Sequence, residues 1–143
     1  MSKNLNVIVH TDGACKGNPG PGSYAAILRF GKATKEVSGK AEGTTTAPRM
    51  ELQAVVAGLE ALTKPCSVVV KSDNRYVISG LMMDRYNWIA NNWLKSNGDP
   101  VAHQDLWQRI FELEEQNKLK LFPMWIPREQ NAEADALAQA ALA

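Results

Sequence analysis

The chain has 143 residues, of which 45% are hydrophobic and 22% charged, and its formal net charge is +1. These values are typical of a globular protein with a sizeable core, so we expect one domain over residues 1–143. No apolar run approaches the roughly 18 residues of a membrane span, and the first six residues are too polar for a signal peptide, so we expect a cytoplasmic protein without a membrane partner. Cys15 and Cys66 are too few for a disulfide framework and are expected to be free thiols.

The first forty residues predict three strands. β-branched residues dominate LNVIVHTDG at residues 5–13, and two further strand-like stretches follow after glycines, GSYAAILRFG at 22–31 and KATKEVSGKA at 32–41. Strands joined by such short connections are typical of an antiparallel meander.

The middle of the chain predicts a helix followed by a strand. APRMELQAVVAGLEAL at residues 47–62 begins with Pro48 at a first helical position and carries apolar residues at helical spacing. CSVVVKSD at residues 66–73 is a short apolar stretch, the pattern of a strand in the centre of a sheet.

The last third predicts further helices and one more strand. The expected elements are helices at residues 74–95 and 101–117, a strand at 118–126 and an Ala-rich helix that starts at Arg128. Pro123 within the strand indicates an edge position, because proline cannot donate to a neighbouring strand. The whole order predicts an α/β fold, a mixed sheet with helices packed on it.

Four acids occupy positions from which they can converge. Asp12 and Asp73 are expected to end two central strands, and Glu51 lies in the first turns of a helix. Asp135 lies inside the last helix, with Asn131 four residues earlier on the same face. Each acid alone has a structural explanation, as a turn former, a partner of a helix N-terminus or an exposed helical residue.

Together the four acids predict a metal site. A cluster of carboxylates repels itself unless cations occupy it, and carboxylate oxygens without His or Cys suit Mg²⁺ or Mn²⁺. Two such ions, about 3.5 to 4 Å apart, can activate a water and stabilise the leaving oxygen of an in-line phosphodiester cleavage. The pattern therefore indicates nuclease chemistry.

The motifs TDGACKGNPGPGSYAAIL, RMEL, KSDNRYV, DLWQRI and NAEADALA occur in this order along the chain. In order and spacing the chain resembles type 1 ribonuclease H over almost its whole length. The resemblance implies a ribonuclease H-like fold, in which three antiparallel strands and then parallel strands form a mixed five-stranded sheet flanked by helices. It also implies a monomeric endonuclease that hydrolyses the RNA strand of RNA/DNA hybrids and leaves 5′-phosphate and 3′-hydroxyl ends. Two Mg²⁺ ions, with Mn²⁺ as a substitute, would be held by the catalytic carboxylates Asp12, Glu51, Asp73 and Asp135, and Asp12 would bridge both ions.

The Gly-rich loop after Asp12 matches the part of the family that detects RNA 2′-hydroxyls in the wide minor groove. The resemblance assigns such contacts to backbone groups around Cys15, Gly17 and Asn18 and to the Asn18 side chain, and a phosphate contact to Thr46. The alternative is that GNPGPG merely turns a hairpin, which is compatible with this role because a rigid turn presents its amides.

A basic protrusion that grips the hybrid in some bacterial relatives has lost its charge here. The matching stretch, DRYNWIANNWLKSNGDPVAHQ at residues 84–104, has as many acidic as basic residues. Fewer phosphate contacts predict weaker binding with a shallower salt dependence. Trp88 and Trp93 remain and could frame a groove for the DNA strand, although large aromatic residues at helical spacing are more often core.

Other departures concern histidines and amides. The stretch WIPREQNAEAD lacks the flexible-loop His of many relatives. Any proton shuttling must therefore come from Arg128, Glu129 or solvent. We expect Glu129→Ala to slow turnover more than binding. Ala47 and Pro48 replace an Asn pair that contacts bases in the family. His103 stands where relatives often have a phosphate-binding Asn, or it caps the following helix.

His10 points to the same side of its strand as Asp12, and a packed neutral side chain is favoured over a catalytic one.

Two rival interpretations of the protein remain, a catalytically silent hybrid-binding module and the nuclease portion of a reverse transcriptase. The intact carboxylate set argues against the first. A start at Met1 without a polymerase-like segment argues against the second.

Overall fold

A computed structural model describes residues 6–143, and Leu5, the first residue of the predicted opening strand, lies outside them. The sheet has five strands in the order β3-β2-β1-β4-β5, so the predicted edge position of β5 is confirmed. The strands are β1 (Asn6–Cys15), β2 (Gly22–Phe30), β3 (Ala33–Lys40), β4 (Cys66–Ser72) and β5 (Leu119–Trp125). β1, β2 and β3 pair antiparallel, whereas β4 and β5 run parallel to β1. The predicted mixed sheet is confirmed.

The expectation that Asp12 ends its strand is wrong. β1 continues to Cys15, because its antiparallel pairing with β2 persists as far as Cys15 opposite Gly22. Its parallel pairing with β4 stops earlier, at His10 opposite Lys71. Asp12 therefore lies within β1 but beyond the last residue that pairs with β4, at the edge where the parallel strands end.

The helices follow the predicted order with two corrections. They are α1 (Ala47–Glu60), α2 (Arg75–Ser79), the π-helix η1 (Gly80–Asp84), α3 (Arg85–Ala90), α4 (Gln104–Gln116), the 3₁₀ turn η2 (Arg128–Asn131) and α5 (Ala132–Leu142). The helix predicted at 74–95 is divided and ends at Ala90, because Asn92 and Trp93 adopt left-handed φ angles of 55° and 62°. The last helix begins at Ala132 rather than Arg128, after the single 3₁₀ turn.

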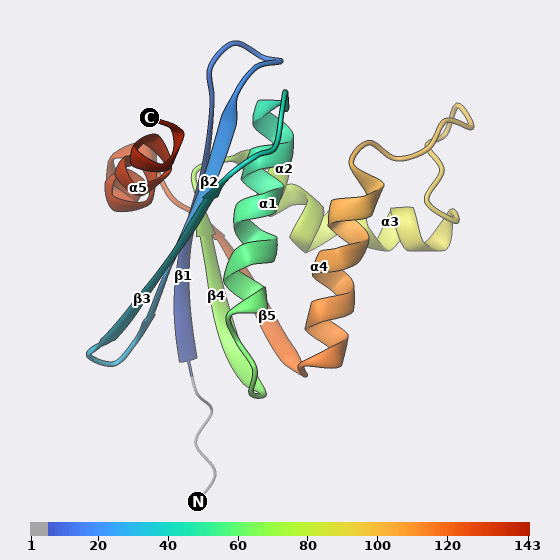
Figure 1. The fold of residues 1–143 in the computed structure, drawn as a ribbon. Helices are drawn as coiled ribbons and strands as arrows, with labels where there is room; N and C mark the ends of the chain where they lie inside the picture. The colour runs from blue at the N-terminus through green and yellow to red at the C-terminus, as the bar shows by residue number, and fades with distance from the viewer. Residues whose placement is uncertain (1–5) are drawn as a thin grey trace, which may run out of the picture.

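The two faces of the sheet are covered by different helices (Figure 1). α1 and α4 lie on one face, where Leu52, Leu59, Trp107 and Ile110 are buried in the main core. Burial of each aliphatic side chain of this kind stabilises the fold by roughly 1.5 to 3 kcal/mol. α5 lies on the other face, where its small residue Ala138 allows it to pack closely against the sheet.

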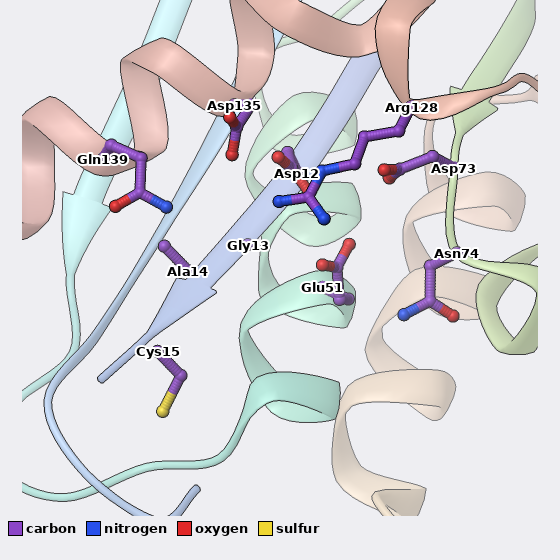
Figure 2. Close-up of a pocket in the computed structure, with 10 residues that line it drawn as sticks. All are labelled: Asp12, Gly13, Ala14, Cys15, Glu51, Asp73, Asn74, Arg128, Asp135 and Gln139. Carbon is purple, nitrogen blue, oxygen red and sulfur yellow. The ribbon is translucent and has the colours of Figure 1, made fainter. Parts of the chain in front are cut away.

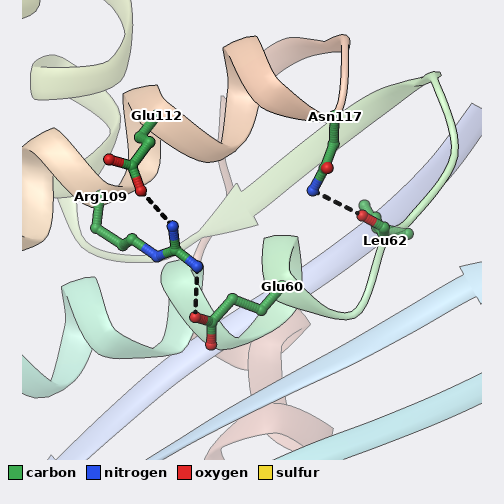
Figure 3. Close-up of polar contacts among 5 residues, drawn as sticks. All are labelled: Glu60, Leu62, Arg109, Glu112 and Asn117. Atoms are coloured by element: carbon green, nitrogen blue, oxygen red, sulfur yellow. Dashed lines mark hydrogen bonds and ion pairs between the residues drawn. The ribbon is translucent and has the colours of Figure 1, made fainter.

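Polar contacts join the carboxyl-terminal ends of α1 and α4 (Figure 3). The Arg109 guanidinium donates to Glu60 on α1, with an N–O distance of 3.1 Å, and to Glu112 on its own helix. The Asn117 side chain donates to the Leu62 carbonyl at 3.1 Å. These contacts, of which the one from Asn117 is partly buried, join the two helices at the end of the sheet away from the four acids.

Two further findings bear on the class of protein. Within residues 6–143, no helix is both long enough and apolar enough to cross a membrane. Cys15 and Cys66 are free and half-buried, and burial raises the pKa of the Cys66 thiol.

Candidate functional site

The predicted carboxylates gather around one cavity of about 300 Å³ (Figure 2). Asp12 on β1, Glu51 on α1 and Asp73 after β4 each place a carboxylate oxygen within 4.8 Å of the other two. Asp135 reaches the same cavity from α5, on the opposite side of the sheet from α1. The structure therefore brings together four acids that lie far apart in the sequence.

The turn after β4 is held by its own polar side chains. The Ser72 hydroxyl accepts a hydrogen bond from the Asn74 backbone at 3.0 Å. The Asn74 side-chain oxygen then caps α2, accepting from the backbone N–H groups of Tyr76 at 2.9 Å and Val77 at 3.2 Å. Because both neighbours of Asp73 are fixed in this way, its side chain is directed into the cavity.

A buried amide links three of the elements that carry carboxylates. Asn131, only 1% exposed, donates from Nδ2 to the Thr11 carbonyl at 2.8 Å and to Oδ1 of Asp73 at 3.4 Å. Thr11 precedes Asp12 on β1, and Asn131 immediately precedes α5, the helix that carries Asp135. One side chain thus ties β1, the end of β4 and the start of α5 together.

The electrostatics of the cavity favour cations. Burial, with the neighbouring charge of Asp73, raises the pKa of Asp12. Burial, with the charges of Asp12 and Asp73, also raises the pKa of Glu51. Within residues 6–143, Oε1 of Glu51 is buried and has no hydrogen-bond partner.

These features fit a hard divalent cation. The convergent donors are all carboxylate oxygens, which Mg²⁺ and Mn²⁺ prefer, and the partnerless Glu51 oxygen is a free ligand atom. A bound cation would also offset the mutual repulsion that, in addition to burial, raises the pKa values of Asp12 and Glu51.

Arg128 extends from η2 over the cavity, and its guanidinium points toward Asp12 (Figure 2). A guanidinium carries N–H donors and no acceptor, so Arg128 supplies positive charge and hydrogen-bond donors rather than a proton relay. Glu129, the other residue that the sequence suggested for this task, is exposed and does not line the cavity.

Asn74 and Gln139, which were not predicted as site residues, also line the cavity. Gln139 lies one helical turn after Asp135 on α5, so the spacing of four residues was a usable signal for a shared face. Asn74 directly follows Asp73, in a position typical of a helix cap.

The loop between β1 and β2 is attached to the start of α1. Gly20 and Thr45 exchange two backbone hydrogen bonds, with N–O distances of 2.9 and 2.8 Å. The Asn18 side-chain oxygen accepts from the Ala47 N–H at 2.9 Å, and the Cys15 thiol donates to the Gly17 carbonyl at 2.9 Å. The loop is therefore a fixed structure next to the cavity, which Cys15 itself lines.

Two other predicted contact residues are placed differently. Thr46 precedes α1, and its hydroxyl is buried without a hydrogen-bond partner in the described part of the chain. Trp88 on α3 is half-buried, with its ring centroid 4.9 Å from that of Trp107 and 5.8 Å from that of Trp93. Its indole thus contributes to the core, the alternative that the sequence left open.

Neither histidine has catalytic geometry. His10 is half-buried, and burial together with Lys71 lowers its pKa, which agrees with a packed neutral side chain. His103 precedes α4 with a left-handed φ of 58°, but its side chain forms no cap. Its Nδ1 lies 3.3 Å from a guanidinium nitrogen of Arg49 instead.

Comparisons with known proteins identify the family to which this chain is similar. The RNase H family model matches residues 4–143. A ribonuclease H of Rickettsia bellii is 44% identical over 120 residues, covering 84% of this chain and 76% of that protein. A ribonuclease H of a Thermoanaerobacter species is 47% identical over 121 residues, covering 83% of this chain and 77% of that protein. The structure of LC11-RNase H1 in complex with an RNA/DNA hybrid is similar with a TM-score of 0.77 and 25% identity, covering 95% of this chain and 96% of that one.

Proposed function

Because this chain belongs to the ribonuclease H family and is thus a nuclease, we propose that it hydrolyses the RNA strand of RNA/DNA hybrids as a monomer, using two Mg²⁺ ions. The observation that carries the proposal is the convergence of the Asp12, Glu51 and Asp73 carboxylates within 4.8 Å, in a cavity that Asp135 also lines. The likeness to a structure that contains an RNA/DNA hybrid supports the choice of substrate.

Asp12, Glu51, Asp73 and Asp135 hold the ions in this proposal, and Mn²⁺ is expected to substitute for Mg²⁺. When bound, the ions would supply a water activated for attack and charge stabilisation for the leaving oxygen. In this proposal Asp12 would be shared by both ions, as the resemblance to the family implies. In-line attack of water on phosphorus releases the 3′ oxygen of the preceding ribose, so the products carry 5′-phosphate and 3′-hydroxyl ends.

The chain's other residues bind and orient the hybrid. The Asn18 side-chain oxygen is already occupied by the Ala47 N–H, which leaves its NH₂ group to donate to a ribose 2′-hydroxyl. Backbone groups of Cys15 and Gly17 make the other 2′-hydroxyl contacts. The phosphate contact predicted for Thr46 would require its hydroxyl, which is buried in the structure, to become accessible. Trp88 is assigned to the DNA strand through the exposed part of its indole.

Cleavage of a labelled RNA/DNA hybrid in Mg²⁺ tests this function directly. The wild type should cut the RNA strand and leave RNA/RNA and DNA/DNA duplexes intact, whereas Asp12→Asn should bind the hybrid without cutting it. Asp99→Asn, at an exposed acid between α3 and α4, is the matched control and should cut normally. If the wild type binds the hybrid but never cuts it, the silent binding module is the correct interpretation.

A further inference from the structure

Arg75 and Trp125 form a stacked pair beside the carboxylates. Arg75 begins α2, two residues after Asp73, and Trp125 ends β5, where it pairs with Ser72. The guanidinium carbon of Arg75 lies 3.9 Å from the centroid of the Trp125 ring. The indole N–H of Trp125 donates to the backbone carbonyl of Asp73 at 3.1 Å. The aromatic platform is therefore attached to the backbone of one of the four acids.

The Arg75 guanidinium is free to bind a ligand. Arg75 is exposed, and within residues 6–143 its side chain has no hydrogen-bond or ion-pair partner. By contrast, four other arginines each pair with a carboxylate, namely Arg29, Arg49, Arg85 and Arg109. In the described part of the chain, the arginines without an anionic partner are Arg75 and Arg128, and both lie at the carboxyl ends of the parallel strands.

We propose that Arg75, held over the ring of Trp125, binds a backbone phosphate of the nucleic acid next to the cavity. This inference rests on the proposed function and adds a phosphate contact to it. Stacking on the indole occupies one face of the guanidinium and leaves its in-plane N–H groups to donate to phosphate oxygens. Because the stack orders the long side chain before binding, less conformational entropy is lost when the phosphate binds.

The charge of the rest of the chain makes this single contact measurable. The stretch at residues 84–104 has no net charge, so it offers little attraction to phosphates. Arg75 should then supply a large share of the salt-dependent part of the affinity. If Arg75 only shielded Trp125 from solvent, its charge would make no difference to nucleic-acid binding.

The test measures hybrid binding against salt concentration. Binding of a short RNA/DNA hybrid to Asp12→Asn in Mg²⁺ is followed between about 50 and 200 mM salt, the range over which phosphate contacts change affinity strongly. Adding Arg75→Gln, which keeps part of the aliphatic stem over the indole, should weaken binding about tenfold at the lowest salt. It should also reduce the slope of log affinity against log salt by about 1, as expected for one lost phosphate contact.

Two further variants separate the stacked contact from general charge. Arg75→Lys keeps the charge and should keep the slope while losing affinity, because an ammonium lacks the planar fork. Lys64→Ala removes the same charge from the opposite end of β4 and should leave the slope unchanged. An unchanged slope in Arg75→Gln, or an equal loss in Lys64→Ala, would overturn the inference. Cleavage of the hybrid by the wild type is measured alongside, so that failure of the two proposals can be distinguished. Normal wild-type cleavage together with an unchanged slope in Arg75→Gln contradicts only the phosphate contact.

Discussion

A Cβ atom on Gly13 would lie 2.7 Å from the backbone nitrogen of Glu51, closer than any real Cβ contact. The carbonyl carbon of Met50 is equally near, so β1 and the first turns of α1 are in direct backbone contact at this point. This close approach brings the Glu51 carboxylate to that of Asp12, the residue before Gly13. The glycine in TDG therefore helps to set the geometry of the carboxylate cluster.

Gly13→Ala is expected to push α1 away from β1. Overpacking of this kind costs about 1 to 3 kcal/mol of unfolding free energy, and the displacement should also weaken Mg²⁺ binding and slow cleavage. Gly31→Ala is the control, because Gly31 has open space around it but a φ of 58°, so alanine there is strained without any clash. That variant should lose about 1 to 2 kcal/mol and still cleave normally. Normal Mg²⁺ affinity in Gly13→Ala would contradict the role given to this contact.

Asn131→Ala should damage both stability and metal binding. The change leaves the buried Thr11 carbonyl without its side-chain donor, a loss of about 1 to 3 kcal/mol, and releases the Asp73 carboxylate from its amide partner. Chemical unfolding and Mg²⁺ titration should therefore both show a loss. In the absence of metal, Asn131→Asp should be no more stable than Asn131→Ala, because it adds a further negative charge beside Asp73.

Gln130→Ala is the matched control for Asn131. Gln130 is exposed on the same 3₁₀ turn, and its side chain lines no part of the cavity. We expect wild-type stability and Mg²⁺ affinity from it. If Asn131→Ala destabilises the protein but binds Mg²⁺ as the wild type does, the amide serves the fold alone.

The convergence of the four acids could be predicted because it depends on topology. Parallel strands stop pairing at one edge of a sheet, so Asp73, which follows β4, meets Asp12, which lies on β1 just beyond its last pairing with β4. The extension of β1 beyond Asp12 could not be predicted in the same way. It depends on how far β2 continues to pair, and the local sequence around Asp12 does not encode that partner.

The features that escaped prediction are contacts between distant segments. Arg75 and Trp125 are fifty residues apart in the chain, and each has an ordinary local role, as a helix start and a strand end. The end of α3 at Ala90 depends on left-handed backbone at Asn92 and Trp93, which helix propensity opposes only weakly. Neither the pairing of Arg75 with Trp125 nor the left-handed residues after α3 gives a periodic signal in the sequence. Both features could therefore be found only from the structure.

Arg128 is expected to matter more for turnover than Glu129. The sequence favoured Glu129→Ala as a variant that slows turnover, but only Arg128 lines the cavity. A guanidinium at the cavity can donate to a phosphate of the substrate, and losing such a charged donor costs about 1.5 to 3 kcal/mol. Arg128→Ala should therefore lower kcat roughly 10- to 100-fold. Steady-state cleavage of the hybrid by the two alanine variants decides between them. Equal kcat values for Arg128→Ala and the wild type would show that Arg128 takes no part in the reaction. A loss of kcat in Glu129→Ala alone would support the expectation from the sequence that Glu129 assists turnover.

Asp12→Asn should make the metal-free protein more stable at alkaline pH while abolishing cleavage. The pKa of Asp12 is raised in the folded state, so the folded protein binds this proton more tightly than the unfolded chain does. The stabilising effect of this proton is complete below the ordinary carboxyl pKa of about 4. The effect is lost as the pH rises through the raised pKa of Asp12 in the folded protein. Glu51 acts in the same direction. Unfolding in a chelator should therefore show wild-type stability that falls between mildly acidic and alkaline pH, and Asp12→Asn should reduce this fall.

Mg²⁺ should reverse the loss in the wild type, because a ligand present at 100 times its Kd adds about 2.7 kcal/mol to the unfolding free energy. The same addition should stabilise Asp12→Asn less, since one ligand of the proposed site is missing. Asp99→Asn, a loss of the same charge from an exposed loop, should follow the wild type in both conditions. A wild-type stability that rises steadily with pH in chelator, with no difference from Asp12→Asn, would mean that neither burial nor mutual repulsion disfavours the ionised carboxylates in the folded protein. Hydrogen bonds within the fold would then account for the arrangement of the cluster. There would be no electrostatic reason for it to bind a cation.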